Sequence, residues 1–393
     1  MKWERKTINE VCNVGDGAHA SIKRTTEGFQ YLTSKNFKLD GLDLNKVDFI
    51  SEVDYFKHFR DDSKAITKPK SNDVLLSIIG SLGAPYLVKE EDVFGLSSSV
   101  SILRPKNEII EPRFLFYWIK SNEFQSSINN IKSGVAQSFL SLGMIKSLPV
   151  IYPKELPTQR KIASILSAYD DLIENNLKRI KLLEEKAFVS YKLLMNSEKL
   201  IEGKVGDLAD VKSGYAFKSR DWSDEGFPVI KIKNIGNNDI DLIGCSFIPE
   251  NIAEAANKFK LNAGDLLIAM TGATVGKIGM MPKTETSFYL NQRVGIFKPK
   301  IQNAELFLFC FFNEPSAKNA VESLASGAAQ PNISGSQLES IKLFYPKFET
   351  VLEFGNSIKS HFQMIWNLKE QNTKLREARD ILLPKLMNGQ IEV

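Results

Sequence analysis

Cysteine and histidine are scarce in this chain, whose 393 residues include only three of each. The cysteines, Cys12, Cys245 and Cys310, are odd in number and widely spaced, which argues against a disulfide framework or a cysteine-based zinc site. No apolar run reaches the roughly 18 residues of a membrane-spanning helix. The opening Met1–Arg5 does not resemble a signal peptide. We therefore expect a cytoplasmic protein with no membrane partner.

Motifs of known catalytic chemistry are also missing. The sequence has no Gly-x-Gly-x-x-Gly loop and no Pro-Pro pair, which excludes the (Asn/Asp)-Pro-Pro-aromatic motif of amino-methyltransferases. Gly272–Ile278 is superficially similar to a phosphate loop, but its glycines are too close and Ile278 replaces the hydroxyl residue that magnesium needs. We expect no catalytic residue, no metal and no bound cofactor, so an interaction protein is favoured over an enzyme.

Length and composition indicate a globular protein of more than one domain. The chain is 43% hydrophobic and 25% charged, and its length suits two or three domains. Lysine and arginine number 51 against 47 aspartate and glutamate, a net charge of +4. This mild basic excess permits a polyanionic partner but does not prove one.

The sequence repeats itself once. Ser133–Gln137 returns as Ser326–Gln330, and over the 21 positions from Ser133 to Pro153 eight pairs are identical at a displacement of 193 residues. Earlier blocks also correspond, with Gly28–Phe37 resembling Gly226–Ile235 and Asp73–Leu76 resembling Asp265–Ile268. Two copies are too few for a solenoid, so the pattern indicates a duplicated domain.

Each copy reads as a globular part followed by a long helix. Short apolar runs such as 74–79, 229–232 and 266–270 predict strands, and 112–125 and 304–312 predict helices, which gives an α+β fold. We expect globular domains at 1–153 and 200–346, separated by helical segments at 154–199 and 347–393. The helices are predicted to pair as an antiparallel coiled coil about a pseudo-two-fold axis, with dimerisation of separate chains as the alternative.

The coiled-coil prediction rests on apolar residues at alternating spacings of three and four. Thr158–Met195 contains no proline or glycine, and Pro384 is expected to end the second helix. A second apolar stripe in the first helix contains Ile165, Ala168, Leu172, Leu182 and Val189. The predicted coiled-coil positions are Ile162, Leu166, Tyr169, Ile173, Asn176, Ile180, Leu183 and Ala187, then Phe354, Ile358, His361, Ile365, Leu368, Asn372, Leu375 and Leu382.

Polar and basic residues in turn-rich segments are the candidates for DNA contact. Arginine bonds guanine, asparagine and glutamine bond adenine, and lysine and serine mostly hold phosphate. A solvated surface is the alternative for each residue taken alone. Repetition of Asn36 as Asn234 and of Gln137 as Gln330 favours a function, but duplicated turn structure explains a shared asparagine equally well. The candidates are His19, Lys23, Arg24, Ser34, Lys35, Asn36, Ser98, Ser99, Gln137, Lys212, Tyr215, Lys231, Lys233, Asn234, Thr274, Lys277, Asn291, Gln292, Arg293, Gln330 and Asn332.

An ordered set of motifs spanning the chain resembles the specificity subunit of type I restriction-modification systems. The set contains the Asp16-Gly17-x-His19 turn, Gly28–Phe37, Gln159–Leu166, Gly264–Leu267, Leu290–Arg293, both Ser-Gly-x-Ala-Gln loops and Leu382–Gly389. Ser97–Ser99 departs from the pattern, because the second copy has Asn291–Arg293 there.

The resemblance implies that the two globular domains are target-recognition domains, each of which reads one half of a bipartite DNA site. It also implies that the coiled-coil helices act as a spacer and as the docking surface for partner subunits. Its partners would be double-stranded DNA, two methyltransferase subunits and restriction/translocase subunits. S-adenosylmethionine, ATP and Mg would come with those partners, which methylate adenine N6 or cleave. Alternatives are the specificity subunit of a related system with a fused methylase-nuclease partner, and a coiled-coil scaffold that does not bind DNA.

Overall fold

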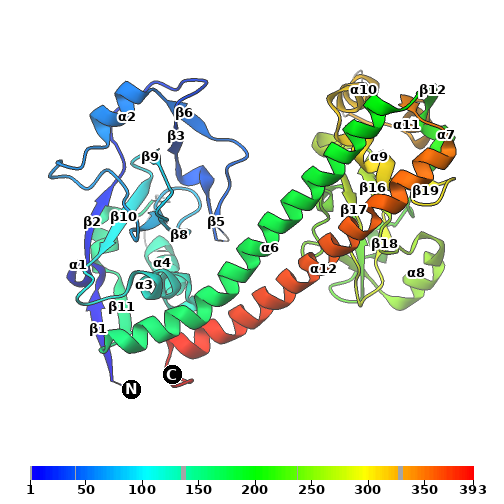
Figure 1. Cartoon of the computed structure of the whole chain (residues 1–393). Helices are drawn as coiled ribbons and strands as arrows, with labels where there is room; N and C mark the ends of the chain where they lie inside the picture. Colours follow the sequence, from blue (N-terminus) through cyan, green and yellow to red (C-terminus); the bar gives the residue numbers. More distant parts are fainter. Residues whose placement is uncertain (1, 40, 134–138, 237, 326–330) are drawn as a thin grey trace. The chain divides into compact units, whose positions relative to one another are not determined.

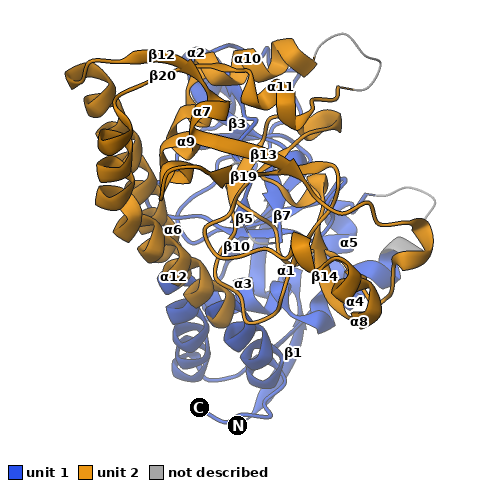
Figure 2. Ribbon diagram, turned by 90° about the vertical axis from the view of Figure 1, so that its right-hand side faces the viewer, with its two compact units in different colours: residues 1–172, 375–393 blue, residues 173–374 orange. Residues whose placement is uncertain are grey.

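A computed structural model describes residues 2–39, 41–133, 139–236, 238–325 and 331–393. Figure 2 colours its two compact units. Unit 1 contains residues 1–172 and 375–393, and unit 2 contains residues 173–374. The long helices α6 (Leu156–Ser197) and α12 (Phe348–Met387) each contribute to both units.

Unit 1 is built on an antiparallel four-stranded sheet of order β2-β10-β7-β8. A second sheet, β6-β3-β9, contains one parallel pair, β3 with β9. Strands β1 and β11 pair separately, as do β4 and β5. The elements are β1 (Trp3–Thr7), α1 (Ile8–Val11), β2 (Cys12–Asp16), β3 (Phe29–Leu32), β4 (Phe37–Lys38), β5 (Gly41–Leu42), β6 (Asp48–Ile50), α2 (Glu52–His58), β7 (Val74–Ser77), β8 (Pro85–Leu87), β9 (Phe94–Leu96), β10 (Val100–Pro105), α3 (Pro112–Lys120), α4 (Asn122–Ser133), α5 (Leu142–Ser147) and β11 (Pro149–Pro153).

Unit 2 repeats this arrangement. Its four-stranded sheet has the order β13-β19-β16-β17, its second sheet is β15-β14-β18 with β14 parallel to β18, and β12 pairs with β20. The elements are β12 (Ile201–Lys204), α7 (Val205–Leu208), β13 (Ala209–Ser213), β14 (Phe227–Ile230), β15 (Ser246–Ile248), α8 (Glu250–Ala255), β16 (Leu266–Ala269), β17 (Ile278–Met280), β18 (Tyr289–Leu290), β19 (Val294–Pro299), α9 (Ala304–Asn313), α10 (Pro315–Ala325), α11 (Gly335–Glu339) and β20 (Lys342–Tyr345). Together the units confirm the α+β prediction.

The repeated glycine at the start of β3 and β14 has a backbone reason. Gly28 and Gly226 both have φ of +123°, a region that side chains disfavour. A Cβ atom on Gly28 would lie 2.3 Å from the carbonyl oxygen of Ile50, and one on Gly226 would lie 2.4 Å from that of Ile248. The neighbouring strand therefore approaches too closely for any other residue in either unit.

The two long helices pack against each other along the predicted apolar positions (Figure 1). In unit 2, Ile180, Ala187, Ile358 and Ile365 are buried in one core. In unit 1, the start of α6 and the last turns of α12 share a core with α3 and β11, to which Ile162, Leu166, Leu386 and Met387 contribute. Tyr169, Leu183 and Leu375 are only half-buried.

Two details of the helix predictions are wrong. Helix α12 continues through Pro384 to Met387, because proline can kink a helix without ending it. Helical hydrogen bonding resumes beyond it, since the Pro384 carbonyl accepts from Asn388 N at 3.0 Å. The helix predicted over 112–125 is two helices, because Ser121 is extended and its hydroxyl accepts from Phe124 N at the start of α4.

Candidate nucleic-acid interface

Several segments predicted to bind DNA meet at one end of the four-stranded sheet in each unit, and the Lys23-Arg24 segment is not among them. In unit 1, antiparallel pairing places the ends of β2 and β7 beside the start of β10. In unit 2, the ends of β13 and β16 lie beside the start of β19. We call the segments gathered there the loop end: residues 16–19, 33–36, 78–84, 97–99 and 139 in unit 1, and 213–216, 231–234, 270–277, 291–293 and 332 in unit 2.

Backbone hydrogen bonds tie each loop end together, and five of those that link its separate segments correspond one to one between the units. In unit 1 they run from Ala18 N to Leu96 O (2.8 Å), Ser97 N to Leu32 O (3.0 Å), Ser98 N to Ala18 O (3.2 Å), Ile78 N to Ser99 O (3.0 Å) and Leu140 N to Ile78 O (2.9 Å). In unit 2 they run from Tyr215 N to Leu290 O (2.8 Å), Asn291 N to Ile230 O (3.1 Å), Gln292 N to Tyr215 O (2.9 Å), Met270 N to Arg293 O (3.1 Å) and Ile333 N to Met270 O (2.9 Å). We call this set the backbone frame.

Glycine allows the two central turns of the frame to touch. A Cβ atom on Gly17 would lie 2.3 Å from the carbonyl oxygens of Leu96 and Ser97, and one on Gly214 would lie 2.2 Å from that of Leu290. Glycine is therefore required for close packing at the second position of Asp16-Gly17 in unit 1 and of Ser213-Gly214 in unit 2.

Side chains at equivalent positions of the frame differ in chemistry. Ala18 in unit 1 corresponds to Tyr215, and the small hydroxyls of Ser97–Ser99 correspond to Asn291–Arg293. Ser99 Oγ accepts a hydrogen bond from Ser34 N at 2.9 Å and lies 2.6 Å from Ser97 Oγ. A common backbone thus presents two different sets of groups.

The basic candidates of unit 1 are exposed, and two of them have partners within the chain. The His19 ring nitrogen lies 2.8 Å from Asp16 Oδ2, with the His19 side chain 73% exposed. Arg24 donates to Asp48 at 3.0 Å and lies 4.1 Å from the centroid of the Tyr31 ring. Lys23 and Lys35 are exposed.

Asn36 and Asn234 have a structural role in a turn that both units share. They are 4% and 1% exposed. The Asn36 amide accepts from Thr33 N and donates to Asp43 O and Lys46 O, and the Asn234 amide accepts from Lys231 N and donates to Asp241 O. Since both amides are bound to their own turns, we assign them to supporting the loop end rather than to contacting bases. Ser34 is likewise buried.

The candidates of unit 2 divide into exposed and packed side chains. Tyr215 packs on Phe217 and Phe259, Asn291 is buried, and Thr274 Oγ1 donates to Ile232 O at 3.3 Å. The exposed candidates are Lys212, Lys233, Lys277, Gln292, Arg293 and Asn332. Gln137 and Gln330 lie outside the described residues.

Lys231 is held by an aromatic ring. Its Nζ lies 3.3 Å from the centroid of the Trp222 ring and donates to Ser246 Oγ at 2.9 Å. Burial, and then repulsion from Lys233, lowers the pKa of the Lys231 ammonium. The arrangement fixes the direction of this amine beside the loop end.

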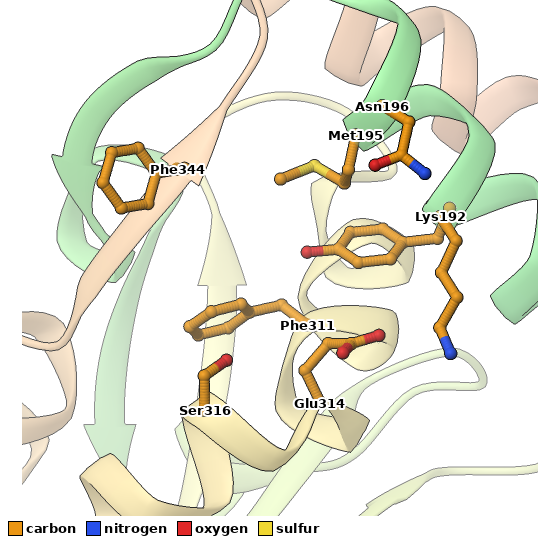
Figure 3. Close-up of a pocket in the computed structure, with 8 residues that line it drawn as sticks. Lys192, Met195, Asn196, Phe311, Glu314, Ser316 and Phe344 are labelled. Atoms are coloured by element: carbon orange, nitrogen blue, oxygen red, sulfur yellow. The ribbon is translucent and has the colours of Figure 1, made fainter.

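Each unit has a surface hollow among its described residues. The hollow in unit 2 has a volume of about 360 Å³, and Figure 3 shows Lys192, Phe311, Glu314 and Phe344 around it. The hollow in unit 1 has a volume of about 700 Å³, and its lining includes Cys12, Asp16 and Lys106. Within the described ranges, no three His, Cys, Asp or Glu side chains are placed to hold a metal ion. No helix of the described chain is long and apolar enough to span a bilayer.

Comparison with known proteins identifies relatives along nearly the whole chain. Residues 1–185 and 198–374 match the family described as Type I restriction modification DNA specificity domain. The chain is 26% identical over 343 residues to the MjaVIII specificity subunit of Methanocaldococcus jannaschii, covering 82% of this chain and 80% of that protein. It is 22% identical over 400 residues to the HindI specificity subunit of Haemophilus influenzae, covering 82% and 87%. Its fold is similar to the crystal structure of the type I restriction-modification S subunit from M. genitalium, with a TM-score of 0.59 at 18% identity, covering 98% of this chain and 96% of that one.

Proposed function

Because the chain belongs to the family of type I restriction-modification specificity subunits, we propose that each of its units reads one half of a bipartite site in double-stranded DNA. The chain is the non-catalytic DNA specificity subunit of its enzyme. One observation carries the proposal of two half-sites: the backbone frame is the same in both units, while the side chains mounted on it differ. A fixed frame with variable side chains suits a reader of two different short sequences.

Reading is proposed to take place in the major groove, where each base pair shows a distinct set of donors and acceptors. In unit 2 the exposed Gln292 and Arg293 are suited to adenine and guanine edges, respectively. The lysines around them, Lys212, Lys233 and Lys277, would hold phosphates and set the register. In unit 1, Lys23, Arg24 and Lys35 would do the same.

The helices α6 and α12 are proposed to set the spacing between the half-sites. Both helices pass from one unit into the other, and in unit 2 they are joined by a buried hydrogen bond between Asn176 and Asn372. A 40-residue helix is about 60 Å long, enough to span more than one turn of duplex at about 34 Å per turn.

An apolar stripe on α6 is proposed to dock the methyltransferase subunits. Leu182, Val189 and Leu193 are separated by seven and four residues, which places them on one face, and they are 63%, 56% and 64% exposed. Large apolar side chains gathered on one helix face mark a surface for a partner. The partners would bring S-adenosylmethionine and flip one adenine per half-site for N6 methylation. Restriction/translocase subunits would supply the ATP- and Mg-dependent cleavage.

The proposal is tested by reconstituting the chain with its methyltransferase subunits and methylating a DNA library with long randomised segments. Sequencing the methylated fraction should give two short fixed half-site sequences separated by a spacer of constant length. Binding should weaken steeply with salt, because several lysines and arginines displace counterions from phosphates. A methylated motif that consists of one uninterrupted sequence would refute the proposal. Recovery of the same motif from a reaction without this chain would also refute it.

A further inference from the structure

Two apolar side chains are exposed at the loop end of unit 1. Ile79 and Phe139 face each other across an antiparallel bridge, and they are 45% and 40% exposed. The bridge belongs to the backbone frame, because Ile78 N donates to Ser99 O and Leu140 N donates to Ile78 O. Ile79 and Phe139 therefore lie next to the Ser97–Ser99 turn. A single exposed apolar residue is ordinary, but a paired set among candidate DNA-binding turns calls for a partner.

Unit 2 shows that the frame itself does not require apolar residues at these positions. The corresponding bridge joins Thr271 to Asn332, and the same hydrogen bonds flank it through Met270 and Ile333. Both units form this bridge, one with a threonine and an asparagine and the other with an isoleucine and a phenylalanine. The two units therefore differ in the side chains at this bridge and not in its backbone.

The apolar pair fits one feature of the major groove. Base edges there present hydrogen-bond donors and acceptors, with the C5 methyl group of thymine as the apolar exception. The neighbouring Ser97–Ser99 and Ala18 of unit 1 are small and uncharged, so they leave room for a base edge but offer no guanidinium for guanine.

We propose that Ile79 and Phe139 contact the C5 methyl of a thymine in the half-site that unit 1 reads, whereas in unit 2 the exposed Asn332 faces a polar base edge and the Thr271 hydroxyl is buried. The proposal rests on the proposed function, since it needs unit 1 to read DNA. It identifies a determinant of specificity for one half-site only.

The test replaces thymine by uracil, which lacks only the methyl group, one position at a time in a duplex carrying the preferred site. Binding by the reconstituted complex is measured by gel shift in competition with the unmodified duplex. One uracil position in the unit 1 half should weaken binding about three- to tenfold, as expected for loss of one buried methyl group. Uracil in the unit 2 half is the internal control for general effects on the duplex.

The variant Ile79→Thr/Phe139→Asn, which copies unit 2, should remove the sensitivity to uracil in the unit 1 half while leaving the unit 2 half-site unchanged. Site-specific binding with no effect of uracil at any thymine of the unit 1 half would overturn this inference and leave the proposed function intact. Absence of any site-specific binding would instead refute the proposed function. The uracil duplexes need only the natural chain, so the test does not depend on the variant folding.

Discussion

Asn176 Nδ2 donates to Asn372 Oδ1 at 2.9 Å, and both side chains are buried between α6 and α12. A buried amide pair among apolar residues is satisfied in only one register, because a shift of either helix leaves two polar groups unpaired. The pair therefore specifies how the two helices align, and on the proposed function it also sets the spacing of the half-sites.

The first prediction concerns this pair. Asn372→Leu should lower the free energy of unfolding by about 1–3 kcal/mol, because it leaves the Asn176 amide buried and unpaired. Asn176→Leu/Asn372→Leu should recover most of the loss, since two apolar residues of similar size pack at the same place. Urea unfolding of the four proteins of the double-mutant cycle measures this coupling. Strictly additive losses would show that the two amides do not depend on each other.

Shortening both helices tests their role as a spacer. Removing seven residues from α6 and seven from α12, on the same side of the Asn176–Asn372 pair, keeps the heptad phase and the pair. It shortens the helices by about 10 Å, which is about three base pairs of duplex. The spacer in the methylated motif should shorten by about three base pairs, while both half-site sequences stay the same. The same deletion in α6 alone should destabilise the protein, because it moves Asn176 out of register. If the spacer in the methylated motif keeps its length after the matched deletion, α6 and α12 do not set the spacing of the half-sites.

A polar network joins α3, α6 and α12 in unit 1. Asp170 accepts from Tyr117 Oη at 2.7 Å and from Arg379 Nη1 at 2.6 Å, and Arg379 is 8% exposed. Asp170→Asn should destabilise the protein by about 2 kcal/mol, because it leaves a largely buried guanidinium without this partner. The neighbour Asp171, whose side chain is 68% exposed, is the matched control, and Asp171→Asn should cost less than about 0.5 kcal/mol. Equal urea midpoints for the two variants would contradict this account.

Glu184 gives a prediction for pH. Burial raises the pKa of its carboxyl, and the attraction of Lys369 only partly opposes this. The folded chain thus favours the protonated form, so Glu184 lowers stability increasingly as pH rises through its folded-state pKa. Glu184→Gln should raise the urea midpoint at pH 8, and the gain should shrink as pH falls toward 4.5. Glu185→Gln, at the exposed neighbouring position, is the matched control and should change the urea midpoint little at either pH. A gain for Glu184→Gln that did not vary with pH would contradict the effect of burial.

Much of this fold follows from the sequence, because duplication provides an internal comparison. The apolar spacing predicted the paired helices and placed Asn176 and Asn372 between them. Pro384 misled the prediction because proline can either kink or end a helix, and α12 continues beyond it to Met387.

The individual site residues were harder to predict. Asn36 and Asn234 suit both a base edge and a tight turn, and only their buried amides show that they serve the turn. Ile79 was missed because it continues the apolar run of β7, although the strand ends at Ser77. Aligning it with Thr271 would have drawn attention to the position, but its exposure depends on the bridge to Phe139, sixty residues away.

The most direct test of the two-reader account is to map methylated adenines in cells that carry variants of one loop end at a time. Gln292→Ala/Arg293→Ala alters unit 2, and Ser98→Ala/Ser99→Ala alters the equivalent positions of unit 1. Each variant should change or weaken the sequence specificity at one half-site of the methylated motif and leave the other half-site and the spacer as they are. The account would be contradicted if a single variant changed both half-site sequences. It would also be contradicted if neither variant changed either half-site sequence.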